Sequence, residues 1–308
     1  MQLGADHVRV QVPATSANLG PGFDSLGLAL AYYDTLEVRA LASSQVRVDV
    51  TGEGAGEVPD DERHLVVRAL RVALDPVGAP QTGLHLTCAN RIPHGRGMGS
   101  SAAAVVAGLL AARMLVADPD GLDDATVLAL ATELEGHPDN AAPAILGGAT
   151  VAWTPSSEAG PRAVRLRVHP DVTPTVVVPV TRLATRTARG VLPELVPHGD
   201  AAFNAGRTAL LVHALAEDPD LLFDATADRL HQEYRSGVMV SSWELVRGLR
   251  DQGIAAMVSG AGPTVLVLDR VGREHAVAAA IEELVGGSDL WAALQPGVDT
   301  RGAVAERM

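Results

Sequence analysis

A glycine-rich segment that leads directly into an apolar stretch constrains this chain more than any other feature. It reads Pro93-His94-Gly95-Arg96-Gly97-Met98-Gly99-Ser100-Ser101-Ala102-Ala103, and a mostly apolar run follows as far as Val116. Glycines allow backbone N–H groups to approach a ligand closely, and the first turn of a helix adds N–H donors without partners. With the positive end of the helix dipole, these groups form a site for a phosphate-sized anion. A plain glycine-rich turn, capped by Ser100 or Ser101, is the alternative.

The spacing of the glycines separates this loop from commoner phosphate-binding motifs. A Walker loop requires lysine and then Ser or Thr directly after its last glycine, and no lysine follows Gly99. A dinucleotide-binding fingerprint requires G-x-G-x-x-G after the first strand, whereas Gly95, Gly97 and Gly99 alternate near residue 100. The loop therefore favours neither a P-loop NTPase nor a dinucleotide enzyme.

The hydrophobic pattern predicts an α+β protein of two domains. The chain has 308 residues, of which 47% are hydrophobic but 3% aromatic, so Ala, Val and Leu must build the core. The polar, proline-bracketed stretch 154–161 predicts a boundary between an N-terminal domain over 1–155 and a C-terminal domain over 160–308. The predicted strands are 8–12, 29–40, 45–50, 84–89, 147–153, 164–168, 175–180, 254–258 and 265–268. The predicted helices are 65–74, 100–116, 125–134, 201–215, 219–230, 242–250 and 274–284.

Charge and composition indicate which partners to expect. The net charge of −13 disfavours nucleic acid and anionic membranes, because both repel an acidic protein. No apolar region follows Met1 to form a signal peptide, and no charge-free apolar stretch reaches the length of a membrane span. The single cysteine, Cys88, is expected to be a small buried residue in a strand. These features predict a cytoplasmic protein without a membrane or nucleic-acid partner.

Two further segments carry a family resemblance. They read Pro13-Ala14-Thr15-Ser16-Ala17-Asn18-Leu19-Gly20-Pro21-Gly22-Phe23-Asp24-Ser25-Leu26-Gly27 and Val258-Ser259-Gly260-Ala261-Gly262-Pro263-Thr264. With the glycine-rich loop they resemble the three motifs of the GHMP kinases, which phosphorylate small molecules of metabolism. Further matches are Glu133-Leu134-Glu135-Gly136-His137-Pro138-Asp139-Asn140, Thr185-x-x-Ala188-Arg189 and His231-Gln232-x-Tyr234-Arg235. The order and spacing match over nearly the whole chain, and the first segment most resembles the homoserine kinases of this family.

The resemblance implies a fold and a reaction. The fold would pair a ribosomal-protein-S5-like N-terminal domain with a ferredoxin-like C-terminal domain, with the active site between them. The reaction would be the ATP-dependent, Mg2+-requiring phosphorylation of the side-chain hydroxyl of L-homoserine to O-phospho-L-homoserine, in threonine biosynthesis. A GHMP kinase for another alcohol, such as mevalonate or a sugar, and a catalytically inactive protein of this fold are the alternatives. The oligomeric state is open, and a homodimer is among the options.

On the nucleotide side, the resemblance assigns Pro93–Ala103 to the triphosphate of ATP. It points to Glu133 as the carboxylate near the β- and γ-phosphates, with Glu135 as the alternative. Ser100 would offer its hydroxyl to the metal, because Mg2+ prefers oxygen ligands and usually binds one or two carboxylates together with phosphates. The family usually has asparagine where His64 stands near the adenine, so contacts to the base are left open.

On the acceptor side, the resemblance places the 137–140 segment against the amino acid. His137 would contact the substrate. Either Asp139 or Asn140 would lie beside the attacking hydroxyl, with Asn140 favoured and no strong general base. The reactive proton would then pass to phosphate or water.

The two charged ends of the acceptor require charged partners. An ammonium group requires a carboxylate, and a carboxylate is best held by arginine. The resemblance therefore assigns Asp24, helped by Asn18, to the ammonium group. It assigns Arg189 and Arg235, with Thr185, to the carboxylate, and Arg189 is counted among the catalytic residues as well.

Overall fold

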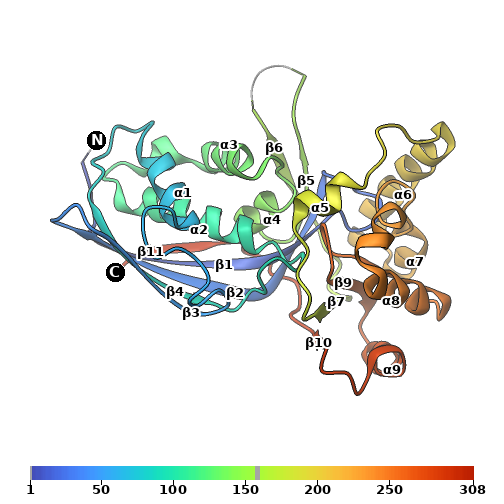
Figure 1. Cartoon of the computed structure of the whole chain (residues 1–308). Coiled ribbons are helices and arrows are strands. Elements are labelled where there is room, and N and C mark those ends of the chain that lie inside the picture. The colour runs from blue at the N-terminus through green and yellow to red at the C-terminus, as the bar shows by residue number, and fades with distance from the viewer. Residues whose placement is uncertain (1, 157–159) are drawn as a thin grey trace.

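The computed structural model describes residues 2–156 and 160–308 and arranges them around two β-sheets (Figure 1). The seven-stranded sheet contains β1 (His7–Ala17), β2 (Leu26–Leu41), β3 (Val46–Gly52), β4 (Gly83–Asn90), β5 (Ala149–Trp153), β6 (Arg162–Leu166) and β11 (Val304–Arg307). The four-stranded sheet contains β7 (Val172–Pro179), β8 (Ala256–Val258), β9 (Val265–Arg270) and β10 (Trp291–Leu294). Helices accompany both sheets, so the predicted α+β class is confirmed.

The long strand β2 organises the larger sheet. It pairs with β1 along most of its length, with β4 through residues 35–41 and with β5 through residues 26–28. The pairing of β1 with β2 changes register between Pro13 and Ala14, where proline has no N–H to donate to the ladder. Beyond this point β1 is buried. Its last residue, Ala17, contacts the second sheet, where its carbonyl oxygen accepts a hydrogen bond from the Gly260 N–H in the turn between β8 and β9.

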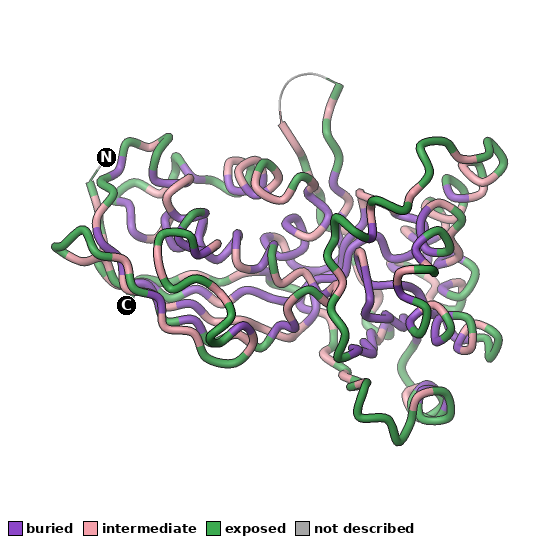
Figure 2. The backbone as a smooth tube through the Cα atoms, in the orientation of Figure 1, coloured by how far each residue is buried: buried purple, intermediate pink, exposed green. Residues whose placement is uncertain are grey.

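The helices α1 (Leu65–Leu74), α2 (Ser100–Leu115), α3 (Asp124–Glu135) and α4 (Ala141–Leu146) cover one face of the larger sheet (Figure 1). Helix α2 lies in the centre of this layer and is buried on nearly all sides, because it packs against β1, α1 and α3 (Figure 2). Gly108 permits the close contact with α1, since a Cβ there would lie 2.4 Å from the Val66 carbonyl oxygen. The all-round apolar sequence of α2 is thereby explained.

The smaller sheet has helices on both faces. Helices α8 (Val240–Asp251) and α9 (Glu274–Val285) share a core with Val265 and Val267 of β9. Leu266 and Leu268 point to the opposite face, toward α6 (His198–Ala216) and α7 (Leu222–Ala225). The remaining elements are α5 (Thr185–Gly190), η1 (Pro119–Leu122), η2 (Pro219–Leu221) and η3 (Glu233–Val238). No helix in the described part of the chain is long and apolar enough to cross a bilayer.

The chain crosses from the larger to the smaller sheet at a different position from the predicted domain boundary. Residues 154–161 connect β5 to β6, which pair with each other in the larger sheet, although 157–159 lie outside the described residues. The chain enters the smaller sheet only at β7, and β11 later returns to pair with β1. A polar, proline-bracketed stretch can connect two paired strands as readily as two domains. The predicted division into 1–155 and 160–308 therefore does not coincide with the division between the sheets.

The predicted helix over 219–230 is wrong in its second half. Helix α7 ends at Ala225, and the Asp228 carboxylate then accepts hydrogen bonds from the backbone N–H groups of residues 230–232. An aspartate side chain that binds nearby N–H groups competes with helical hydrogen bonding and favours a turn. The polar turn that replaces the helix leads to Arg235 in η3.

Candidate active site

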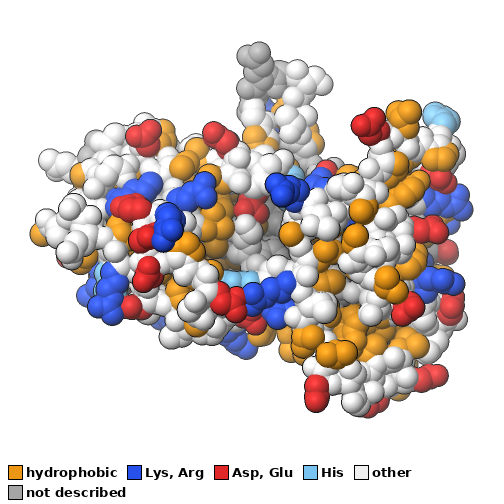
Figure 3. Space-filling model, in the orientation of Figure 1, with side chains coloured by type: hydrophobic (Ala, Val, Ile, Leu, Met, Phe, Trp, Pro, Cys, Tyr) orange, Lys and Arg blue, Asp and Glu red, His pale blue; other side chains and the backbone are white. Residues whose placement is uncertain are grey.

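Two cavities meet at the beginning of α2. The polar cavity has a volume of about 270 Å³ and is lined by Ala17, Asn18, Gly95, Gly97, Gly99, Ser100, Ser101, Ala102, Leu134, Glu135, His137, Asp139, Asn140, Leu183, Thr185, Arg189, Arg235, Gly260 and Ala261. The apolar cavity, of about 330 Å³, includes Leu36, Val58, Pro59, His64, Leu65, Val66, His94, Ser100, Ser101, Ala103, Ala104 and Ala107 in its wall. Ser100 and Ser101 line both cavities. The molecular surface is hollowed between the two halves of the molecule, with charged side chains around the hollow (Figure 3).

The glycine-rich loop is held through its carbonyl groups. The backbone N–H groups of Leu183, Thr264 and Thr15 bind the carbonyl oxygens of residues 95, 96 and 98 respectively. The three glycines at 95, 97 and 99 have left-handed φ angles of 64°, 78° and 68°, which glycine adopts without steric cost. Gly99 is the N-cap of α2, so the free N–H groups of the first helical turn lie at the cavity wall. The loop can therefore bind an anion through backbone donors.

The third motif fixes this loop to β1. The Ser259 hydroxyl donates to the Gly97 carbonyl at 2.6 Å and also lies 2.8 Å from the Ser16 hydroxyl. The Asn18 amide donates to the Gly260 carbonyl at 2.9 Å. All three segments thus converge on one wall of the polar cavity. Ser16 and Ser259 stand within the matched segments, but nothing in their spacing predicted that they would meet.

We expect Gly97→Ala to weaken ATP binding by about tenfold or more, which corresponds to roughly 1.4 kcal/mol. A Cβ at this position would lie 2.4 Å from the Ser259 carbonyl oxygen, and the left-handed φ adds strain. The loop must therefore shift and move its N–H donors. Calorimetric titration with a non-hydrolysable ATP analogue measures the effect.

Gly253→Ala is the matched control for this prediction. Gly253 has a similar left-handed φ of 74°, but a Cβ there would have nothing within 4 Å. This variant shares the backbone strain without the clash and should bind ATP normally. Unchanged ATP affinity in a folded Gly97→Ala protein would argue against the phosphate-binding role of the loop.

The structure separates the two candidate metal-binding carboxylates. Glu135, the last residue of α3, lines the polar cavity and accepts a hydrogen bond from the Ser101 hydroxyl at 2.6 Å. Burial raises the pKa of Glu135, and Ser101 and His137 partly offset this. Glu133 is exposed and lies outside the set of residues that line the cavity. The geometry therefore favours Glu135, the alternative in the sequence analysis, over Glu133.

A chain of hydrogen bonds links the 137–140 segment to β1. His137 Nδ1 lies 2.8 Å from Asp139 Oδ1, and the Asn140 amide donates to the same oxygen at 3.3 Å. The Thr15 hydroxyl donates to Asn140 Oδ1 at 2.8 Å. Asp139 is buried, and its hydrogen bond raises the pKa of His137. Sequence reasoning missed Thr15, although it lies in the first matched segment.

Asp24 and Arg189 form an ion pair that the sequence did not predict. The guanidinium group donates two hydrogen bonds to the carboxylate, at 2.6 and 3.1 Å. Arg189 Nε is buried and has no partner among the described residues. Arg189 lines the polar cavity, as do Asn18, Thr185 and Arg235, whereas Asp24 does not. The cavity wall therefore carries two guanidinium groups, and one of them, that of Arg189, is paired with the Asp24 carboxylate.

The remaining residues of the loop divide between the two cavities and the core. His94 and Ala103 face the apolar cavity, and Gly95 and Ala102 face the polar one. Pro93 and Met98 are buried. Arg96 forms an ion pair with Glu53 at 3.2 Å. Not every residue of the predicted phosphate-binding segment is thus available to a ligand.

His64 has a structural role at the wall of the apolar cavity. It is buried and is the N-cap of α1, where its Nδ1 accepts a hydrogen bond from the Val66 N–H at 3.3 Å. Burial lowers the pKa of His64, and the nearby His94 adds to this effect. The capping function explains how histidine can stand here, since asparagine is also a good N-cap.

We expect His64→Asn to reduce the loss of stability in mild acid. Because the pKa of His64 is lowered in the folded state, its contribution is complete above the unfolded pKa and is lost as pH falls below it. The unfolded chain then takes up a proton that the folded chain does not. Urea unfolding at pH 7.5 and 5.5 should show a smaller decrease in His64→Asn than in the wild type. Equal decreases would contradict the prediction.

Comparison with known proteins identifies the family. The GHMP kinases N terminal domain matches residues 64–148. A homoserine kinase of Streptomyces coelicolor is 54% identical over 297 residues, which cover 96% of this chain and 93% of that protein. The chain belongs to the homoserine kinase family. Another homoserine kinase, from Clavibacter michiganensis subsp. michiganensis, is 51% identical and covers 97% of this chain and 94% of its own length.

Solved structures agree with this homoserine kinase assignment. The homoserine kinase of Cytophaga hutchinsonii superposes with a TM-score of 0.84 at 25% identity, over 98% of both chains. The mevalonate diphosphate decarboxylase of Staphylococcus aureus, at 17% identity and a TM-score of 0.69 over 98% of both chains, shows the fold alone. The chain therefore has the GHMP kinase fold and is an ATP-using kinase.

Proposed function

We propose that the apolar cavity binds the base of ATP, that the glycine-rich loop binds its phosphates, and that the rest of the polar cavity binds L-homoserine. The chain then transfers the γ-phosphoryl group of ATP to the side-chain hydroxyl of L-homoserine and forms O-phospho-L-homoserine, a step of threonine biosynthesis. This proposal rests on the observation that Ser100 and Ser101 line both cavities. Phosphates bound at these two serines would lie between the nucleotide base and the acceptor.

The donors around the phosphate loop suit Mg2+. Among the described residues, no group of three or more His, Cys, Asp or Glu side chains could hold a metal ion. Glu135 supplies one carboxylate, and Ser100 and Ser101 supply hydroxyl groups. Mg2+ binds with one or two carboxylates, phosphates and water rather than in an all-protein cage. We therefore assign the metal to Glu135 and Ser100 in place of Glu133 and Ser100; when bound, Mg2+ would neutralise charge on the phosphates.

Asn140 is the group that we assign to the acceptor hydroxyl. Its Oδ1 accepts from Thr15, and a carbonyl oxygen has a second lone pair for the substrate O–H. Asp139 Oδ1 is already shared by His137 and Asn140, so Asp139 orients these side chains. The chain offers positioning rather than a strong base, and the hydroxyl proton can leave to phosphate or water. Phosphoryl transfer depends mostly on such positioning and on charge neutralisation.

The ion pair at the end of the cavity suits a zwitterion. An amino acid carries an ammonium group and a carboxylate on one carbon, and Asp24 and Arg189 present the complementary charges side by side. Arg235 provides a second guanidinium group for the carboxylate. Asn18, Thr185 and His137 would complete the contacts.

A coupled ADP-release assay tests this function directly. L-homoserine should be phosphorylated with the highest kcat/KM, ahead of 4-hydroxybutyrate, which lacks the ammonium group, and 2-amino-1,4-butanediol, which lacks the carboxylate. Faster turnover of mevalonate or a sugar would show that the acceptor is wrong while the kinase assignment stands. No ADP release with any alcohol would point to the inactive alternative.

The residues that we assign to ATP and to L-homoserine all come from this one chain. We propose the cytoplasm as its location, where ATP is available and thiols stay reduced. Cys88 is buried, and burial raises its pKa to about 12, so it takes no part in the chemistry.

A further inference from the structure

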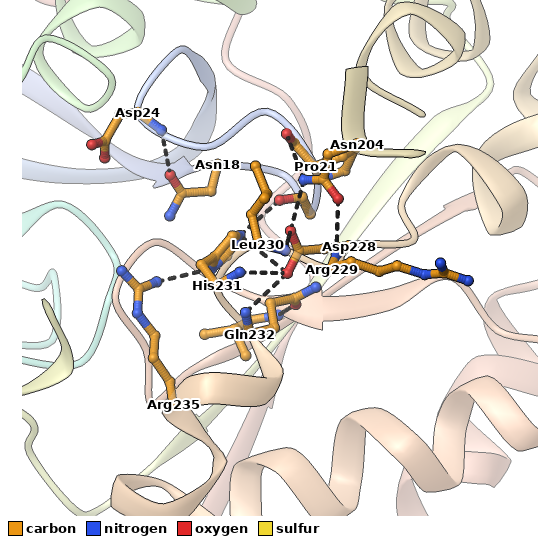
Figure 4. Close-up of polar contacts among 12 residues, drawn as sticks. Asn18, Pro21, Asp24, Asn204, Asp228, Arg229, Leu230, His231, Gln232 and Arg235 are labelled. Atoms are coloured by element: carbon orange, nitrogen blue, oxygen red, sulfur yellow. Dashed lines mark hydrogen bonds and ion pairs between the residues drawn. The ribbon is translucent and has the colours of Figure 1, made fainter. Parts of the chain in front are cut away.

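His231 connects the buried arginine of the acceptor site to the first motif (Figure 4). Its Nε2 lies 2.7 Å from the Gly20 carbonyl oxygen, and its Nδ1 lies 2.9 Å from Arg235 Nη1. Both side chains are almost completely buried, with 0% exposure for His231 and 1% for Arg235. The ring also stacks on Phe23, with 5.0 Å between the ring centroids.

The partners of His231 determine its tautomer. A carbonyl oxygen only accepts and a guanidinium group only donates, so Nε2 must carry the hydrogen and Nδ1 must be free. Burial lowers the pKa of His231, which keeps the ring neutral. A second proton on Nδ1 would face Arg235 donor to donor. The ring can therefore hold the arginine only in its neutral form, with hydrogen on Nε2.

The other contacts of Arg235 leave one nitrogen for a ligand. Nε donates to the Ala188 carbonyl at 3.1 Å, and Nη1 also donates to the Gly260 carbonyl at 3.2 Å. Nη2 has no protein partner within the described ranges, and the side chain lines the polar cavity. Three fixed contacts thus restrict the guanidinium group to one orientation.

The turn before His231 is fixed in the same way. Asp228 accepts from three successive backbone N–H groups, those of residues 230–232, and from the Asn204 amide at 2.9 Å. Gln232 Oε1 accepts from the Val258 N–H at 2.6 Å. The ring of His231 is therefore placed by a rigid backbone, and Figure 4 shows this network next to the first motif.

We propose that His231 is a positioning residue for acceptor recognition: its Nδ1 holds Arg235 so that Nη2 meets the substrate carboxylate. This inference rests on the proposed function, in which Arg235 binds that carboxylate. His231 itself does not line the cavity and acts through the arginine.

Two substitutions separate the two ring nitrogens. In His231→Asn, the side-chain oxygen stands where Nδ1 stood and can still accept from Arg235, but the Gly20 contact is lost. In His231→Gln, the amide N–H reaches the Nε2 position and can still donate to Gly20, but the acceptor for Arg235 is lost. Both variants lose the stacking on Phe23, so they differ only in whether the contact to Arg235 or the contact to Gly20 is lost.

We expect His231→Gln to raise KM for L-homoserine by about tenfold or more, since hydrogen bonds to charged groups are the stronger ones. His231→Asn should stay within about threefold of the wild type, and KM for ATP should change little in both. The loss in His231→Gln should be smaller for 2-amino-1,4-butanediol, which has no carboxylate. Equal KM values in the two variants, or equal losses for both acceptors, would overturn the proposal.

Two further measurements keep the test decisive. If either variant fails to fold, ¹⁵N NMR of the wild type reports the tautomer, and a hydrogen on Nδ1 of His231 at pH 7 would overturn the proposal. Arg235→Leu distinguishes the proposed acceptor site from the proposed role of His231. A normal KM for L-homoserine in Arg235→Leu contradicts the proposed acceptor site, whereas a raised KM there with a normal one in His231→Gln contradicts the role of His231 alone.

Discussion

Glu135→Gln should lower kcat by about a hundredfold or more, because it removes the carboxylate that we assign to the metal. Glutamine keeps the shape of the side chain and can still accept the hydrogen bond from Ser101, which is 2.6 Å long in the structure. The fold should therefore be retained, and thermal unfolding checks this. Steady-state kinetics with saturating ATP and L-homoserine measure kcat. The Mg2+ concentration for half-maximal rate should rise as well.

Glu133→Gln is the matched control, with the same chemical change on the same helix. Glu133 is exposed, and a helical surface charge contributes only a few tenths of a kcal/mol through its neighbours. We expect kcat within about twofold of the wild type, since exposed substitutions rarely disturb a site. A large loss in Glu133→Gln with normal turnover in Glu135→Gln would return the metal to Glu133.

The choice between these two residues could have been made from the sequence. Leu128 and Ala131 are buried on the inner face of α3, and positions three and four apart share a helical face. Glu135 follows Ala131 by four residues and therefore lies on that face, whereas Glu133 does not. The family resemblance pointed to a helix-end glutamate, but helical periodicity selects the one that faces the cavity.

Other parts of the site could not be predicted from the sequence. Asp24 and Arg189 are separated by 165 positions, and His231 is 211 positions from Gly20. Long-range pairs of this kind depend on how the two sheets are joined, which local propensity and spacing do not encode. The same limit applies to β11, whose four residues join the larger sheet only through pairing with β1.

Local signals predict the elements that build the proposed phosphate site. The sequence predicts a helix over 100–116, and α2 extends over Ser100–Leu115; it predicts another over 65–74, and α1 begins and ends at these residues. Glycines with left-handed φ angles just before the helix and a long apolar run within it can both be recognised in a short stretch of sequence. The roles of Asn140, Thr185 and the other proposed ligands stay predictions until kinetics test them.

Arg235→Leu should raise KM for L-homoserine by tens to thousands of times. Removing one partner of a buried charge pair costs about 2–5 kcal/mol, which corresponds to this range. Burial and the neighbouring Arg189 lower the pKa of Arg235 to about 10, so the group is still charged at pH 7. KM for ATP should change little, because Arg235 lines the part of the polar cavity that we assign to the acceptor.

Arg250→Leu is the control, because it removes a largely buried arginine that lies outside the proposed site. Arg250 donates to Thr226 and to the carbonyl groups of Phe223 and Ala256, and it lines neither cavity of the described chain. Its substitution should lower stability without changing KM for L-homoserine. KM values for acceptors with and without a carboxylate then test whether Arg235 binds that carboxylate. If Arg235→Leu raises KM equally for L-homoserine and for 2-amino-1,4-butanediol, the arginine supports the cavity but does not bind the carboxylate.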